Sequence, residues 1–183
     1  ILVKLLYNTM TIKEFKIIFY WEYIHRILGR VIGIVFLIPL IFFIIQKKIN
    51  KKYLSNCILI MFLICAQGAI GWYMVKSGLV DIPDVSHYRL AIHLLLAFIL
   101  LAFIYWTALS LDISNKFVKR KTFLNQHCNF LLAVIFTQVT FGAFVSGLNA
   151  GHAWNTFPLM NGQIIPNGIL NMSPIIINFF ENQ

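Results

Sequence analysis

Long apolar runs restrict the folds open to this chain of 183 residues. Four of them are nearly free of charged side chains and predict spans at about 24–45, 53–75, 89–111 and 126–148. A helix needs roughly 20 apolar residues to cross the hydrocarbon core of a bilayer, so each run qualifies. Only helices and closed barrels satisfy their backbone hydrogen bonds in lipid, and runs this continuous exclude alternating barrel strands. The sequence therefore predicts an all-α, polytopic bundle with four spanning helices.

Charged residues are few, and the basic ones are clustered. They make up 11% of the chain, against about 25% in a soluble domain, while apolar residues make up 60%. The net charge is +9, but the lysines and arginines lie in short groups between the apolar runs. Groups in that position are topology signals of a membrane protein. They predict lipid, and not nucleic acid, as the surroundings of this chain.

Two basic connections predict the orientation of the spans. They contain four basic residues each: Lys47, Lys48, Lys51 and Lys52 in the first, and Lys116, Lys119, Arg120 and Lys121 in the second. Basic loops stay on the cytoplasmic or matrix side, so the first span is expected to run from outside to inside. Residues 1–23 then lie outside, with no evident signal peptide to carry them there. We therefore expect a further helix upstream, which makes the chain a fragment.

The segment 149–183 differs from the rest because it is rich in Gly, Asn and Pro. This composition predicts an ordered outer loop, followed at 175–180 by an apolar stretch too short to span. Trp154 and Phe157 suit a membrane interface, so the loop is expected to pack over the outer ends of the helices. The predicted organisation is an outer segment (1–23), a transmembrane region (24–148), and an outer loop with the start of a truncated segment (149–183).

Ionisable residues gather where the first predicted span begins. Four residues spaced three, four and four apart lie along one helical face: Glu22, His25, Gly29 and Gly33. The glycines let another helix or a flat ligand approach the backbone. Arg26 and Arg30 are long enough to reach the headgroups and are expected to anchor the helix. A histidine one turn inside an apolar helix gains little from the interface, so His25 suggests another role.

A second histidine, His93, lies near the outer end of the third predicted span. The first and third spans run in the same direction, so His25 and His93 are expected at similar depth. A b-type haem is flat, apolar and held by two axial imidazoles from facing helices. The spacing fits such a site, but alone it leaves haem ligation and a purely structural role equally open. His87 is expected in the loop before this span, solvated or as a helix cap.

Three stretches, in order, resemble the haem A synthase family, the cytochrome oxidase assembly proteins of bacteria and mitochondria. They read EFKIIFYWEYIHRILGRVIG (14–33), GAIGWYMVKSGLVDIPDVSHYRLAIHL (68–94) and FGAFVSGLNAGHAWNTFPLMNGQIIP (141–166). The resemblance extends from about Met10 to Gln183. It implies an eight-helix protein of two similar halves, of which this chain would supply the second to fifth helices. The first helix and the C-terminal helices, with a second histidine pair, would be missing.

The resemblance also implies a reaction, in which a methyl group of haem O is oxidised by successive hydroxylations to the formyl group of haem A. His25 and His93 would be the axial ligands of haem b, and Glu22 the acidic group near the reacting edge. Expected partners are lipid, haem O and the haem O synthase, in the bacterial inner membrane or the mitochondrial inner membrane, with a homo-oligomer left open. The alternatives are a membrane b-type cytochrome that transfers electrons and a non-catalytic assembly or structural protein.

Overall fold

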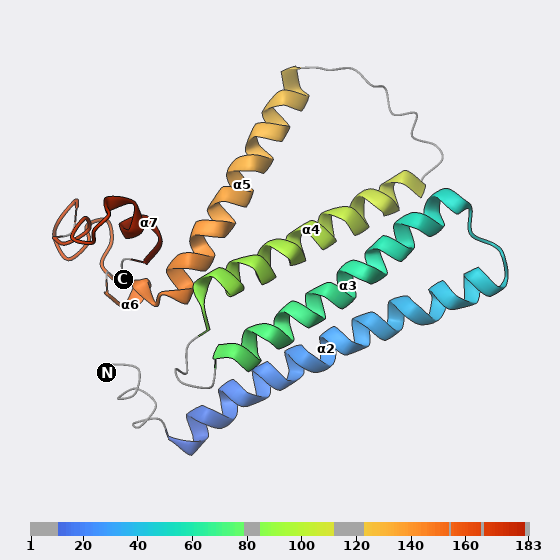
Figure 1. The fold of residues 1–183 in the computed structure, drawn as a ribbon, viewed down its shortest axis with the longest axis horizontal. Coiled ribbons are helices and arrows are strands. Elements are labelled where there is room, and N and C mark those ends of the chain that lie inside the picture. The colour runs from blue at the N-terminus through green and yellow to red at the C-terminus, as the bar shows by residue number, and fades with distance from the viewer. Residues whose placement is uncertain (1–10, 79–84, 112–122, 154, 166, 182–183) are drawn as a thin grey trace. The chain divides into compact units, whose positions relative to one another are not determined.

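The computed structural model describes residues 11–78, 85–111, 123–153, 155–165 and 167–181. Within these ranges the regular elements are all helical: α2 (Ile12–Ile45), α3 (Lys51–Gly78), α4 (His87–Leu111), α5 (Phe123–Gly147), α6 (Ala150–Ala153), the 3₁₀ turn η1 (Ile175–Ile177) and α7 (Asn178–Glu181) (Figure 1). The four long helices α2 to α5 are each long and apolar enough to cross a membrane. The predicted all-α fold with four spanning helices is therefore confirmed.

The helix α2 begins at Ile12, well before the predicted start of the first span at about residue 24. A capping box explains this start: Glu14 N donates to Thr11 Oγ1 at 3.3 Å, and Thr11 N donates to the Glu14 carboxylate at 2.8 Å. Such a pair satisfies backbone donors that a helix start leaves without partners. The charged side chains in this first part interrupt the apolar sequence, but the helix continues through them.

Two compact units make up the chain, and each is described by itself. The first holds Ile1–Ala69 and Leu100–Asp112, and the second holds Ile70–Ile99 and Ile113–Gln183. The first unit therefore contains α2, the first part of α3 and the last part of α4. The second contains the other parts of α3 and α4, together with α5 and everything after it.

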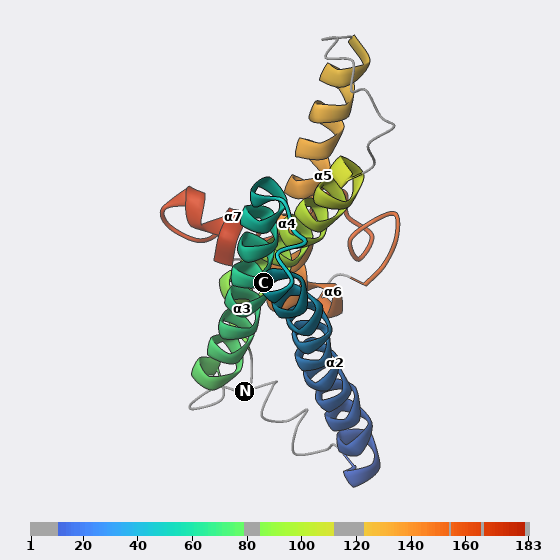
Figure 2. The ribbon, with the colours of Figure 1, turned by 90° about the vertical axis from the view of Figure 1, so that its right-hand side faces the viewer.

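In the first unit, α2 and the first part of α3 run antiparallel beside each other (Figures 1 and 2). Gly33 of α2 lies at the contact, because a Cβ built there would be 3.8 Å from Cγ2 of Ile64 on α3. The hydroxyl of Tyr53 donates to the carbonyl of Ser110 at 3.0 Å and so joins α3 to α4. Few side chains are buried, which leaves the apolar surface of these helices for lipid.

In the second unit, the end of α3 packs against the beginning of α4. The Arg89 guanidinium lies 4.9 Å from the ring centroid of Tyr73, a favourable cation–π geometry. At the other side of α4, the end of α5 approaches the backbone of the first α4 residue at Gly147. Beyond α5, the Phe180 ring of α7 lies 6.2 Å from that of Phe144 on α5. These contacts hold the part of the protein in which His93 lies.

The outer loop is built on a turn held by its own hydrogen bonds. Asn161 and Gly162 have φ values of 52° and 84°, and Met160 and Gln163 exchange backbone hydrogen bonds of 2.9 and 3.1 Å across them. The amide of Asn161 also donates to Thr156 Oγ1 at 2.7 Å. These hydrogen bonds close the turn, and the order of the whole loop stays a prediction. The Phe157 ring is 97% exposed and so does not pack over the helix ends. Trp154 lies outside the described residues, and packing of the rest of the loop stays a prediction.

Candidate functional site

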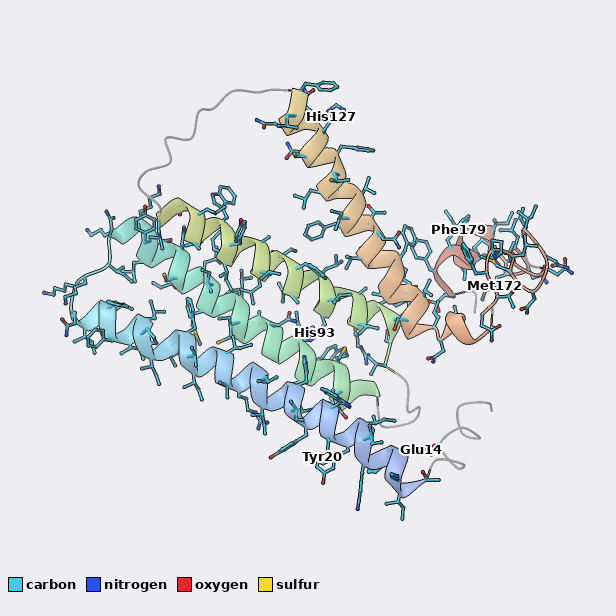
Figure 3. The ribbon with its side chains drawn as sticks, turned by 180° about the vertical axis from the view of Figure 1, so that it is seen from behind. Glu14, Tyr20, His93, His127, Met172 and Phe179 are labelled. Atoms are coloured by element: carbon cyan, nitrogen blue, oxygen red, sulfur yellow. The ribbon has the colours of Figure 1, made fainter. Side chains whose placement is uncertain are left out.

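His93, one of the two predicted iron ligands, is half-buried on α4 and points at the backbone of α3 (Figure 3). A Cβ built on Gly71 of α3 would lie 2.9 Å from its Cε1, 3.5 Å from Nδ1 and 3.7 Å from Nε2. The imidazole therefore occupies the space that any side chain at residue 71 would need. The sequence predicts close approach to the backbone at Gly29 and Gly33, and does not predict it at Gly71.

His25, the other predicted ligand, lies on α2 with an exposed side chain, near the outer end predicted for this span. It belongs to the first unit, whereas His93 belongs to the second. Their arrangement on opposite faces of one haem stays a prediction. Gly29 follows on the same face of α2, and a Cβ built there meets nothing within 4 Å.

Glu22 forms an ion pair with Arg26, one turn further along α2. Both side chains are about half exposed, at 49% and 47%. Arg26 was interpreted only as an anchor, although Glu and Arg four residues apart on a helix are a well-known pairing signal. The contact gives the Glu22 carboxylate a fixed neighbour in the turn that also carries His25.

His87 differs most from its predicted role. It begins α4 and is 7% exposed, so the expectation of a solvated loop residue is wrong, while the alternative of a helix cap stays a prediction. Its ring lies 5.5 Å from the ring of Phe144, and its Nε2 is 3.7 Å from the Glu181 carboxylate. Tyr88 donates to the same carboxylate at 2.6 Å. His87, Tyr88, Phe144, Phe180 and Glu181 form what we call the outer cluster, which joins α4, α5 and α7.

The two predicted ligands are both histidines, the residue type that holds the iron of a b-type haem. Within the described ranges, no three His, Cys, Asp or Glu residues come together to hold an ion. Two histidines on helices of membrane-spanning length are instead the ligands that a b-type haem requires. His93 has an imidazole in a recess between two apolar helices, next to a backbone without a side chain. These residues fit a haem.

The sequence of this chain is similar to known proteins of one family. A sequence profile of the family described as cytochrome oxidase assembly protein matches residues 3–183. A protein of Nitrosospira multiformis named heme A synthase is 46% identical over 94% of this chain and 49% of its own length. Proteins of the same name from Wolbachia pipientis and Parvibaculum lavamentivorans are 44% and 43% identical, over 95% and 94% of this chain and 50% of their own length each. No solved structure matches.

This chain spans about half the length of the curated relatives that it matches. The match covers nearly all of this chain, because the profile leaves only its first two residues outside. Four helices long and apolar enough to cross a membrane accompany it, with His25 on α2 and His93 on α4. The chain belongs to the cytochrome oxidase assembly protein family.

Proposed function

We propose that this chain provides half of a haem A synthase, which oxidises a methyl group of haem O to the formyl group of haem A in the bacterial inner membrane. The observation that carries the proposal is the 46% identity, over 94% of the chain, to a relative named heme A synthase. Haem is an apolar macrocycle, so an enzyme acting on it gains from a site among membrane-spanning helices. The four apolar helices of this chain are such surroundings.

His25 and His93 are proposed to hold the iron of a haem b, each through one imidazole nitrogen. In the His93 ring, Cε1 lies nearest to a Cβ built at Gly71, and the two nitrogens lie on either side of it. Neutral imidazole is the usual protein ligand of haem iron, and the second ring nitrogen can then donate a hydrogen bond that fixes the tautomer. Bound haem would supply the redox chemistry.

Glu22 is proposed to accept or deliver protons during the oxidation. Converting a methyl to a formyl group follows R–CH₃ + H₂O → R–CHO + 4H⁺ + 4e⁻, written as a half-reaction with the electrons passing to an acceptor. Proton removal therefore accompanies every oxidation step, and a carboxylate within reach of the substrate is a suitable base. Arg26, which pairs with Glu22, orients that carboxylate on α2.

The test uses a chimera in which this chain replaces the matching half of the Nitrosospira multiformis relative. The chimera is expressed in a bacterium that makes haem O but lacks its own haem A synthase, and membrane haems are extracted and separated by chromatography. We expect haem A from the chimera and only haem O when either His25 or His93 is changed to alanine. The matched control is His127→Ala. His127 is exposed and lies near the beginning of α5, on the predicted side of the membrane opposite to His25 and His93.

Three results would contradict the proposal. If the chimera is inserted and stable but membranes contain only haem O, the chain does not supply a working half of the synthase. A haem-containing chimera that makes no haem A but reduces or oxidises a quinone would instead indicate an electron-transferring b-type cytochrome. Purified chimera without a Soret band would favour the non-catalytic, structural alternative.

A further inference from the structure

The imidazole of His93 lies close against the backbone of Gly71. A Cβ at residue 71 would lie 2.9 Å from Cε1 of the ring, closer than real Cβ atoms come to other atoms. A side chain at 71 and the imidazole in its present place are therefore mutually exclusive. One of the two would have to move, and the imidazole is the more mobile, because it stands at the end of a side chain.

The orientation of the ring follows from the three distances. Cε1 is nearest to the built Cβ at 2.9 Å, and the two nitrogens that flank it follow at 3.5 and 3.7 Å. The edge of the ring between its nitrogens thus faces α3, and the nearby backbone limits how the ring can turn toward that helix. An iron ligand needs such a limit, because the lone pair of one nitrogen must point along a single direction.

A second contact fixes the two helices that form this recess. Arg89 is one turn before His93 on α4, and Tyr73 is two residues after Gly71 on α3. The Arg89 guanidinium lies over the Tyr73 ring at 4.9 Å, which sets the register of α4 against α3 at this level. The contact of His93 with Gly71 is therefore held by the packing of the helices as well as by the side chain itself.

We propose that Gly71 is a positioning residue for His93: the bare backbone at this point of α3 sets the direction in which the imidazole presents its iron-binding nitrogen. This inference rests on the proposed ligation of haem by His93. Gly68, one turn earlier on the same helix, has nothing within 4 Å of a built Cβ. The space is thus needed at one of the two glycines only, which provides a matched control within α3.

The experiment compares Gly71→Ala, Gly68→Ala and His93→Ala in the 183-residue chain, purified in detergent and titrated with haem b. The readouts are the Soret band and the low-temperature electron paramagnetic resonance spectrum of the ferric form, which reports the orientation of axial imidazoles. We expect Gly71→Ala to shift the low-spin g values and to weaken haem binding by on the order of 10-fold or more, as for residues that orient metal ligands. Gly68→Ala should match the unsubstituted chain.

A haem-free measurement covers the case in which Gly71→Ala folds poorly. If the imidazole is what the new methyl group meets, Gly71→Ala should lower the thermal unfolding midpoint less in a His93→Ala background than in the unsubstituted chain. An equal loss in both backgrounds overturns the proposal, because another part of the protein would then need the space.

The outcomes separate this inference from the proposed function. An unchanged resonance spectrum for Gly71→Ala, with the low-spin signal lost in His93→Ala, overturns the role of Gly71 and leaves the ligand intact. An unchanged spectrum for His93→Ala overturns both, since His93 would not be a ligand at all. A shift for Gly71→Ala together with an equal shift for Gly68→Ala also overturns it, because added methyl groups on α3 would then act without regard to His93.

Discussion

The Glu22 carboxylate contacts the guanidinium of Arg26 one turn along α2, in the same turns that carry His25. An ion pair of this spacing adds only about 0.2–0.5 kcal/mol to the stability of a helix. Its effect is therefore on orientation, because it favours one direction of the carboxylate on the helix surface. The role proposed for this carboxylate is to exchange protons during the oxidation.

Replacing Glu22 by glutamine tests that function at the scale of one residue. Glutamine keeps the size and hydrogen bonding of the side chain but removes the ionisable group. In the chimera, haem retention should survive, and haem A formation should fall by on the order of 10²–10⁴-fold, the usual contribution of a general acid or base. Chromatography of extracted haems measures the loss, with haem O or a partly oxidised haem accumulating.

Arg30→Gln is the control for this change, because it removes a charge from the same helix one turn beyond Arg26. Normal haem A from Glu22→Gln would remove Glu22 from the chemistry and leave it as a partner of Arg26. Loss of bound haem in that variant would make it a structural support for His25 instead.

Glycines decide how closely the helices approach one another. On α5, a Cβ at Gly147 would lie 2.6 Å from both Cα and Cβ of His87, whereas a Cβ at Gly142 meets nothing within 4 Å. The atoms that a Cβ at Gly147 would meet are backbone atoms and the Cβ of His87 on α4, and these cannot rotate aside. The helices α4 and α5 must therefore separate if residue 147 carries a side chain.

Gly147→Ala is expected to destabilise the chain by about 1–3 kcal/mol, the range for overpacking a close contact. Gly142→Ala, in the same helix, should be neutral or stabilising by up to about 1 kcal/mol, because alanine is the better helix former. Unfolding of the detergent-solubilised chain, followed by circular dichroism, measures both. Equal effects of the two substitutions would show that the close approach of α4 and α5 is not maintained in the membrane protein.

The outer cluster ties the short helix α7 to the beginning of α4 through the hydrogen bond from Tyr88 to Glu181. Tyr88→Phe removes that bond while keeping the ring, and should cost about 1 kcal/mol, the net value of a typical hydrogen bond. Cleavage by an added protease at residues 167–181 should become faster. The control is Tyr105→Phe, since Tyr105 is an exposed ring on the same helix. Unchanged cleavage in Tyr88→Phe would mean that the bond does not hold α7.

At the scale of the whole molecule, the position of both lysine-rich connections on one side follows from four spanning helices in sequence. Single cysteines at Ser55, Asn115 and Asn161, introduced after Cys57, Cys65 and Cys128 are changed to serine, test it with a membrane-impermeant thiol reagent. Asn161 should react from outside, and the other two only after the membrane is opened. Asn115 lies outside the described residues. Reaction of the first two from outside would reverse the topology.

The spanning helices could be predicted because their cause is local: an apolar run of sufficient length has few alternatives in lipid. The early start of α2 was missed, since Lys13 and Glu14 interrupt the apolar run without interrupting the helix. Burial of His87 could not be read from its neighbours in sequence. It depends on Phe144 and Glu181, which reach it only when α5 and α7 fold back onto α4. The recess at Gly71 has the same origin.

The length of α2 has a consequence for how protons reach the proposed site. Its 34 residues extend about 51 Å, and a hydrocarbon core of about 30 Å would hold them all only at a tilt of about 54°, beyond the usual range of spanning helices. At an ordinary tilt of about 20°, roughly 13 residues at the beginning of α2 stand outside the core. The core then begins near His25, and Glu22 lies at the level of the lipid headgroups. Under the proposed function, protons exchanged by Glu22 would pass directly to interfacial water, with no relay through the bilayer.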